Sequence, residues 1–401
     1  MPTVMRAAVS GPSESRLQFF REVADVPLFV PLFVASVLVG FRDSMSLPYN
    51  TLFAVERAHM GPLEVGVFLT LRAAGAIVAS LLFGAWFDRK PSLWPLLVAL
   101  GSGAAGYGLM TATTDFAGLC LIGTVPMGMG AAAFPLLFAA AKGWAAKTDL
   151  ATATRSTTLL RASFSLAWGV GPAIGAVVVR EDNYAALFWV SAAFSALALL
   201  PLAMSRIAAP SPVRVASDGA RLGVVATLAA VSLTLFSMAI GMGSVALPVA
   251  VTVDFGGSKF DVGLAMSVCA LLEVPVMLVI AAAPRFSHGF RGMAIGFVAL
   301  AVYFVAAGLA PSSEALIWSQ LPRAIGIGFV SCIGISYLQD LLPNRVGAAS
   351  AHYGNTGQIG SLLAGLAAGA WAEAFDYRSL FWPCAAASLV GLACLAVGRR
   401  R

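Results

Sequence analysis

The chain has 401 residues, of which 59% are hydrophobic and 11% are charged. Soluble domains contain roughly 25% charged residues, so this chain has too little charge to cover a soluble globule. Abundant apolar surface excludes a disordered chain, and no collagen or coiled-coil repeat is present. A membrane-crossing helix needs about 20 mostly apolar residues. The composition therefore predicts an all-α membrane protein that crosses the bilayer about a dozen times.

Twelve apolar runs follow one another with short connections. The longest polar connection, 206–221, follows the sixth run and is rich in Pro, Ser and Arg, as expected of a linker between two halves. We expect a cytoplasmic N-terminal segment (1–25), a six-helix bundle (26–205), the cytoplasmic linker and a second six-helix bundle (222–401). The predicted spans are 26–54, 63–87, 92–111, 116–141, 155–179, 184–205, 222–251, 260–283, 292–310, 314–338, 348–371 and 379–397.

Several kinds of site and processing signal are not predicted. Residues 1–25 lack a short apolar core followed by a small-residue cleavage site, so no cleavable signal peptide is expected. The histidines are scattered, which gives a metal site no support, and no cofactor is expected. The cysteines lie in apolar runs without a CxxC motif and are interpreted as small buried hydrophobic residues: Cys120, Cys269, Cys332, Cys384 and Cys394.

The two halves repeat each other. The segment EVGVFLTL, which begins at Glu64, matches DVGLAMSV, which begins at Asp261, with an offset of 197 residues. The segment that begins at Asn183 matches the one that begins at Asp376, with an offset of 193. Many secondary transporters consist of duplicated halves with the substrate site between them near the bilayer midplane.

The distribution of basic residues predicts the orientation, because cytoplasmic loops are rich in Lys and Arg. A cytoplasmic N-terminus leaves only Arg57, Arg180, Lys259 and Arg378 on the opposite side of the membrane. Both termini are therefore predicted to be cytoplasmic, and the +6 net charge gives no indication of nucleic-acid binding. The cytoplasmic basic residues are then Arg6, Arg16, Arg21, Arg89, Lys90, Lys142, Lys147, Arg155, Arg206, Arg214, Arg221, Arg285, Arg291, Arg345, Arg399, Arg400 and Arg401.

Away from the span ends, six charged residues lie inside the predicted spans, where a charge is costly and usually faces a cavity or a partner. They are Arg42, Asp43, Arg72, Arg161, Glu273 and Arg323. One interpretation is a water-filled cavity with a protonatable carboxylate and cationic substrate contacts. The other is structural pairing, in which Arg42 or Arg72 neutralises Asp43 across a helix interface.

Asp43 and Glu273 are the predicted proton-coupling residues. Glu273 has no charged neighbour in sequence and is the better candidate for cycling a proton near neutral pH. Asp43 follows Arg42, although adjacent helix positions do not face each other. The arginines are predicted substrate contacts. Polar residues suited to sugar hydroxyls are Asn50, Gln320, Asn355, Gln358, Tyr49 and Tyr353.

Glycines on two spans indicate close helix packing. Pro172, with Gly169, Gly171 and Gly175, predicts a kinked and tightly packed fifth span. Gly365 and Gly369 give the eleventh span the small-xxx-small spacing.

Three motifs resemble those of a known family. Gly84, Asp88 and Arg89 match the GxxxDR core of the loop signature of the major facilitator superfamily, although Pro91 replaces its following glycine. The Gly-Pro-x-x-Gly of the fifth span resembles the antiporter motif of that superfamily. More specifically, the chain resembles the bacterial sugar efflux transporters at Tyr337–Thr356, at Leu272–Pro275, and at Arg161 with Ser165–Trp168.

The resemblance implies the major facilitator fold, with two pseudo-symmetric six-helix bundles and a cytoplasmic gate formed by Gly84, Asp88 and Arg89. It also implies proton-coupled export of a small sugar or glycoside by alternating access. The arginines keep an alternative open, since guanidinium groups suit carboxylates and phosphates. In that case the cargo is an anion, such as an organic acid, a sugar acid or a carboxylate siderophore, or a drug.

Other classes of function find little support. A membrane-embedded enzyme would need a nucleophile–base pair, metal ligands or a nucleotide loop, and no HExxH, GxSxG or GxxxxGK[ST] motif is present. A sensor or lipid-handling protein is the remaining alternative, and no appended soluble domain supports signalling. We expect a monomeric, multi-pass protein of the bacterial inner membrane whose partners are protons, a small molecule and the bilayer.

Overall fold

The computed structural model describes residues 28–145, 150–205, 222–282, 289–343 and 345–400. Over these residues the chain is helical and contains no strand, so the predicted all-α class is confirmed. The predicted N-terminal segment (1–25) and linker (206–221) lie outside the described residues.

Six helical stretches make up the first half of the chain. They are α2 (Phe29–Leu52) with η1 (Phe53–Arg57), α3 (Pro62–Arg89), α4 (Trp94–Leu109), the series α5 (Phe116–Ile122), η2 (Gly123–Met127), α6 (Gly128–Ala131) and α7 (Ala133–Ala145), then α8 (Leu150–Val178), and η3 (Arg180–Asp182) with α9 (Tyr184–Ala203).

Six more stretches make up the second half. They are α10 (Val224–Val249) with η4 (Ala250–Asp254), α11 (Lys259–Ala282), α12 (Gly289–Leu309), α13 (Ser313–Trp318) with α14 (Gln320–Leu341), α15 (Val346–Ala374), and η5 (Arg378–Leu380) with α16 (Phe381–Arg399).

Each predicted span coincides with one of these stretches. Among the described residues, nine stretches are long and apolar enough to cross a membrane. The other three are α4, which has 16 residues, and α8 and α15, which have 29 residues each but begin with polar turns. The structure therefore places a helix at every predicted span.

The sequence repeats mark equivalent helix starts in the two halves. Glu64 accepts a hydrogen bond from the Gly61 amide at 2.9 Å, and Asp261 accepts one from the Ser258 amide at 2.8 Å. Asn183 and Asp376 likewise accept from the amide three residues further on. These side chains satisfy amide groups that have no partner inside the helix. The π-helical turns η1 and η4 are also 197 residues apart.

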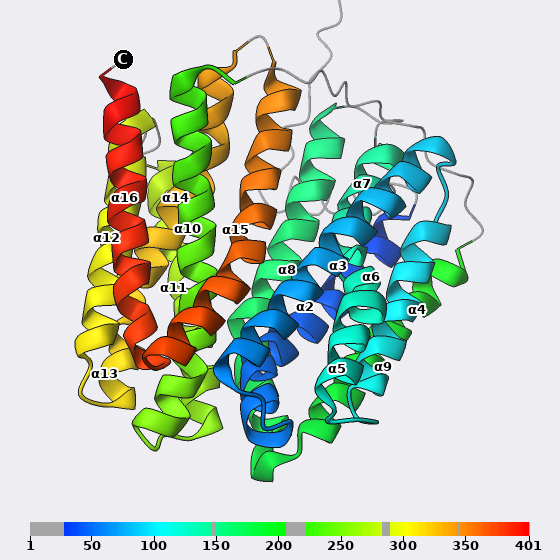
Figure 1. Cartoon of the computed structure of the whole chain (residues 1–401). Helices are drawn as coiled ribbons and strands as arrows, with labels where there is room; N and C mark the ends of the chain where they lie inside the picture. Colours follow the sequence, from blue (N-terminus) through cyan, green and yellow to red (C-terminus); the bar gives the residue numbers. More distant parts are fainter. Residues whose placement is uncertain (1–27, 146–149, 206–221, 283–288, 344, 401) are drawn as a thin grey trace, which may run out of the picture.

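The helices form two groups that meet along two seams. In the first half α2 packs against α8 and α9, and in the second half α10 packs against α15 and α16. The groups meet where α3 contacts α15 and where α8 contacts α11 (Figure 1).

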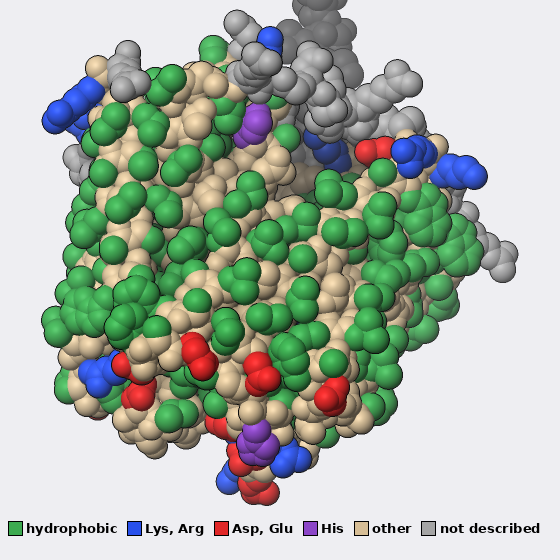
Figure 2. Space-filling view, in the orientation of Figure 1, with side chains coloured by type: hydrophobic (Ala, Val, Ile, Leu, Met, Phe, Trp, Pro, Cys, Tyr) green, Lys and Arg blue, Asp and Glu red, His purple; other side chains and the backbone are tan. Residues whose placement is uncertain are grey.

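The outer surface is apolar over most of its height. Figure 2 shows hydrophobic side chains across the face of the molecule, with charged residues near its upper and lower ends. Monomeric soluble proteins rarely expose contiguous apolar patches of this size, so this belt indicates contact with lipid.

The two ends of the molecule carry opposite charge. We call the upper end the basic end; its described basic residues are Arg89, Lys90, Lys142, Arg291, Arg345, Arg399 and Arg400. We call the lower end the acidic end, because acidic residues predominate there. These are Glu56, Glu64, Asp115, Glu181, Asp182, Asp254, Asp261, Glu314, Glu373 and Asp376.

Candidate substrate cavity and the contacts that close one end

A cavity of about 530 Å³ lies between the two halves. Helices α2, α3, α6 and α8 line it from the first half, and α10, α11, α14 and α15 line it from the second. Four of the six predicted membrane charges reach its wall: Asp43, Arg72, Glu273 and Arg323. The fold thus brings together charges that lie far apart in the sequence.

Arg42 is held behind the cavity wall rather than on it. Its Nε donates to Asp43 Oδ1 at 2.8 Å, and its Nη2 donates to Asp43 Oδ2 at 3.1 Å. Its Nη1 donates to the carbonyl of Gly130 and to Ser195 Oγ, and the Arg42 side chain is only 2% exposed. The pairing occurs within one helix, so the expectation that adjacent positions would not face each other is wrong for this long, flexible side chain.

Arg323 is fixed by neutral partners. Its Nη1 donates to Gln320 Oε1 at 3.1 Å, and its Nη2 donates to Ser244 Oγ at 3.2 Å. Its guanidinium carbon lies 5.5 Å from the centroid of the Tyr303 ring. Gln320 is fully buried and lies behind Arg323 rather than on the cavity wall. This arrangement fixes a cation at the wall without neutralising it.

Glu273 shares the cavity wall with Arg323 but is not paired with it. Cys269 Sγ lies 3.7 Å from Glu273 Oε1 and is its hydrogen-bond partner. In the described part of the chain, neither Glu273 nor Arg72 forms an ion pair. A carboxylate in this setting can gain or lose a proton without first breaking a salt bridge.

Three polar groups in the wall have no hydrogen-bond partner among the described residues. Both amide atoms of Asn50, which is 1% exposed, are unpartnered, as are Trp168 Nε1 and Arg323 Nε. All three residues line the same cavity. Buried polar groups are normally satisfied, so these groups indicate a place where a ligand or water binds.

Several predicted site residues lie elsewhere. Arg161, Asn355 and Gln358 are exposed and do not line this cavity. Tyr353 is half-buried, and its hydroxyl lies 3.5 Å from the carbonyl oxygen of Ser331. The structure does not bring these side chains into the cavity wall, and their predicted role in substrate binding stays a prediction.

Sequence reasoning missed other wall residues, namely Trp168, Ser244, Cys269 and Ser361. Small neutral side chains in a membrane helix carry no signal that separates cavity from packing. Trp168 was detectable only because it ends a segment that resembles the sugar efflux transporters.

The predicted gate motif lies at the basic end of α3. Asp88 and Arg89 are exposed, and neither forms an ion pair with any residue that the structure describes. A Cβ atom added at Gly84 would meet nothing within 4 Å. Within the described part of the chain the motif thus makes no ion pair in this conformation, and its role in gating stays a prediction.

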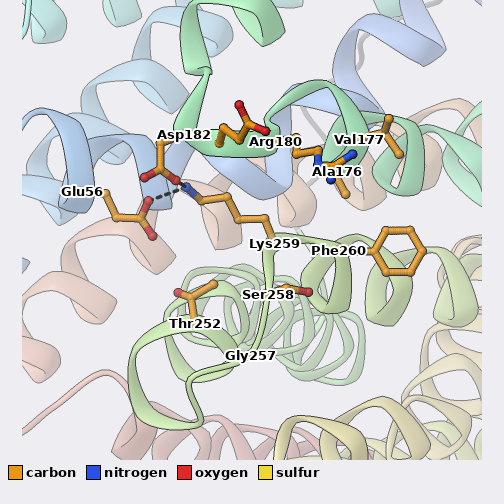
Figure 3. A pocket seen from close by; sticks show the side chains of 11 residues that line it. Glu56, Ala176, Val177, Arg180, Asp182, Thr252, Gly257, Ser258, Lys259 and Phe260 are labelled. Atoms are coloured by element: carbon orange, nitrogen blue, oxygen red, sulfur yellow. Dashed lines mark hydrogen bonds and ion pairs between the residues drawn. The ribbon is translucent and has the colours of Figure 1, made fainter.

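At the acidic end, an ion cluster joins the two halves (Figure 3). Lys259, at the start of α11, places its Nζ 2.7 Å from Glu56 Oε2 and forms a second ion pair with Asp182. Its Nζ also lies 4.5 Å from the centroid of the Tyr184 ring, whose hydroxyl donates to Glu56 Oε2 at 2.7 Å. We call Lys259, Glu56, Asp182 and Tyr184 the acidic-end cluster.

A second contact closes the same end. A Cβ atom on Gly66 of α3 would lie 2.7 Å from both Gly365 O and Gly369 Cα of α15. The predicted small-residue spacing of the eleventh span therefore forms a seam between the halves. Nearby, the Leu63 amide donates to Glu373 Oε2 at 3.3 Å.

The fifth span forms the matching seam with α11. Tyr49 donates its hydroxyl to the carbonyl of Pro172, and the Lys259 carbonyl lies 3.3 Å from the same hydroxyl. A Cβ on Gly263 would lie 2.6 Å from Pro172 O. The halves therefore touch closely at the acidic end, whereas Figure 2 shows the surface hollowed between them near the basic end.

Comparison with known proteins agrees with this architecture. The sequence profile of the Major Facilitator Superfamily matches residues 32–282 and 229–401. A mutant of the nucleoside transporter NupG superposes with a TM-score of 0.78 at 16% identity, covering 92% of this chain and 99% of that one. A POT family peptide transporter superposes with a TM-score of 0.76 at 13% identity, covering 95% and 97%. The chain belongs to the major facilitator superfamily, and it is a membrane transporter rather than an enzyme.

Within the superfamily, its sequence relatives include bacterial sugar efflux transporters. A Deinococcus radiodurans protein that is named as a sugar efflux transporter is 34% identical over 94% of this chain and 99% of its own length. Sugar efflux transporter A of Escherichia coli K12 is 26% identical over 91% of this chain and 94% of its own. The predicted resemblance to the bacterial sugar efflux transporters is confirmed.

Proposed function

We propose that this protein exports a small sugar or glycoside from the cytoplasm in exchange for protons, working as a monomer in the bacterial inner membrane. The observation that carries the proposal is the cavity between the halves, whose wall combines a carboxylate without an ion pair and hydrogen-bonding groups without a partner among the described residues. The names of the relatives support sugar as cargo. Amides, hydroxyls and aromatic side chains bind neutral sugars, and the wall supplies all three kinds.

The orientation follows from charge. Lys and Arg concentrate on the cytoplasmic side of membrane proteins, so the basic end is cytoplasmic. The acidic-end cluster and the seam formed by Gly66, Gly365 and Gly369, which we call the glycine seam, then close the periplasmic side. This conformation is the one in which cargo enters from the cytoplasm, and alternating access requires both contacts to separate.

Glu273 is the proposed proton-coupling group, with Asp43 as the second carboxylate. Glu273 lines the cavity, and its hydrogen-bond partner is the neutral Cys269. Asp43 is already paired with Arg42, whose Nε and Nη2 donate to its two carboxylate oxygens. Proton binding from the periplasm would remove the charge of Glu273 and change its attraction to Arg323 on the same wall.

The test is transport by purified protein in liposomes with an imposed pH gradient. Radiolabelled glucose, galactose and lactose are the probes, and the lumen is made acidic to mimic the periplasm. Accumulation in the lumen that requires the gradient supports proton-driven export. Transport at the same rate and to the same level without a gradient contradicts the coupling.

An anionic cargo is a second candidate, favoured by Arg72 and Arg323. Both line the cavity, and neither forms an ion pair with a residue that the structure describes. Guanidinium groups bind carboxylates in a bidentate manner. Loss of glucuronate or citrate binding in Arg72→Gln and Arg323→Gln, with glucose binding absent from the parent, would favour this candidate.

A further inference from the structure

The unpartnered groups of the cavity form one hydrogen-bonding set. Asn50 comes from α2, Trp168 from α8 and Arg323 from α14, so the set spans both halves of the molecule. Asn50 is 1% exposed and Arg323 is 4% exposed. Arg323 Nη1 donates to Gln320 and Nη2 donates to Ser244, whereas Nε has no hydrogen-bond partner among the described residues.

Hydrogen bonds made by neighbouring residues of α2, rather than by its own side chain, fix the position of Asn50. The preceding residue, Tyr49, is bonded to Pro172 of α8, and Ser44 Oγ donates to Ala167 O at 3.0 Å. Trp168 directly follows Ala167 on the same helix. The two contacts lock α2 against α8, the helices that carry Asn50 and Trp168.

The chemistry of these groups restricts what they can bind. The Asn50 amide offers one acceptor and one NH₂ donor side by side, while Trp168 Nε1 and Arg323 Nε are donors only. A hydroxyl group both donates and accepts, so two neighbouring hydroxyls can satisfy both atoms of one amide. A single carbonyl or a purely apolar ligand would leave the Asn50 oxygen unsatisfied.

We propose that Asn50 binds two adjacent hydroxyl groups of a saccharide and that Trp168 and Arg323 donate to further oxygens of the same ligand. This inference rests on the proposed function and names the feature by which the cavity recognises its cargo. The shared chemistry is a vicinal diol, which neutral sugars and sugar acids both carry. Asn50 and Trp168 are then specificity-determining residues, whereas Glu273 serves coupling.

The first test measures binding without transport. Isothermal titration of the purified full chain with glucose, galactose and lactose identifies the probe that binds most tightly, and monodeoxy derivatives of that probe remove one hydroxyl each. Replacing Asn50 by Ala is expected to weaken binding about tenfold. For the two derivatives that lack a hydroxyl bound by Asn50, the difference in affinity between the variant and the parent should be smaller than for the complete probe, because only one hydroxyl still contacts Asn50.

The control for this series is Gln339→Ala, which removes an amide that lies outside the cavity wall and donates to Ser350 Oγ. It should leave the dissociation constants of all probes unchanged. An unchanged affinity in Asn50→Ala, or an equal loss for every deoxy derivative, overturns the proposal. So does the absence of saccharide binding to the parent protein.

The second test uses Trp168 as a reporter. Saccharide binding should change the tryptophan fluorescence of the parent, and Trp168→Phe should remove that change and weaken binding several-fold. Trp189→Phe is the matched control, because Trp189 is 60% exposed and lies on α9, away from the cavity. A fluorescence change that survives in Trp168→Phe contradicts the contact.

Thermal unfolding separates a binding role from a structural one. Since the Asn50 amide is unpartnered, Asn50→Leu should keep or raise the Tm while abolishing discrimination between the deoxy probes. A lowered Tm with unchanged binding overturns the proposal.

Intact saccharide binding without gradient-driven transport would refute only the proton coupling. Glucuronate tested beside glucose distinguishes acidic from neutral sugars.

Discussion

Lys259 Nζ lies 2.7 Å from Glu56 Oε2, and these two residues belong to different halves of the chain. Lys259 begins α11, and Glu56 belongs to the π-helical turn η1 that ends the first span. Asp182 and Tyr184 complete the contact, so a single ammonium group meets two carboxylates and an aromatic ring. Opening of the acidic end must break all of these interactions together.

Replacing Lys259 by Ala should therefore shift the protein toward a conformation that is open at the acidic end. An exposed ion pair contributes about 0.2–1 kcal/mol and a cation–π contact about 0.5–1 kcal/mol, so the shift is expected to be several-fold. Spin labels at Thr114→Cys and Glu314→Cys, which are exposed at this end of either half, would report it as a larger population of long distances.

Two further variants separate the effect of the Lys259 charge from that of the rest of its side chain. Lys259→Arg should keep the short distances, and Lys142→Ala, at the basic end, should not change them. Identical distance distributions in Lys259→Ala and the parent would show that the cluster does not hold this end closed.

The glycine seam offers a steric test. Gly66→Val should push α3 away from α15, since a Cβ there already lies 2.7 Å from Gly365 O and Gly369 Cα. Overpacking of this kind typically costs about 1–3 kcal/mol. We expect a lower Tm and more of the conformation that is open at the acidic end, measured with the same spin-label pair.

The matched control lies on α4, outside the seam. Gly101→Val introduces the same side chain where nothing lies within 4 Å, and it should leave the distances and the Tm close to those of the parent. Equal effects from both substitutions would show that the seam is not responsible.

The Arg42–Asp43 pair predicts an effect on stability. Removing one partner of a buried pair leaves an uncompensated charge, which typically costs about 3–5 kcal/mol. Because Asp43 is 17% exposed, we expect Arg42→Gln to fall at or below the lower end of that range. The double variant Arg42→Gln with Asp43→Asn should recover much of the loss in thermal unfolding. If Arg42 instead contacts the substrate, Arg42→Gln should lose binding with an unchanged Tm.

Proton coupling makes a prediction about Glu273. Glu273→Gln should abolish accumulation driven by a pH gradient but preserve exchange of labelled for unlabelled cargo, because the cavity keeps its shape while one proton site is removed. Counterflow and gradient-driven transport in the same liposomes measure the two activities. Asp43→Asn is the comparison, and full gradient-driven transport in both variants would contradict the assignment.

Local sequence signals predicted the helices and their repeat well. The apolar runs mark every helical stretch, since a segment in hydrocarbon must satisfy its own backbone hydrogen bonds. The repeat at Glu64 and Asp261 was visible because each carboxylate caps its own helix and accepts a hydrogen bond from an amide only three residues away. Such interactions depend on neighbouring residues alone.

The site was predicted only in part. Charges inside the spans pointed to Asp43, Arg72, Glu273 and Arg323, which line the cavity. Composition gave no way to separate them from Arg42, because its burial depends on Gly130 and Ser195, which are distant in sequence. Trp168 was missed as a wall residue for the same reason.

The sequence alone therefore determined the membrane class, the positions of the helices and the family, because these follow from hydrophobicity, local capping and short motifs. Only the tertiary structure decided which charges meet. The pairing of Lys259 with Glu56 and the unpartnered state of Asn50 both depend on how two six-helix groups pack against each other, and that packing brings together residues from opposite halves of the chain.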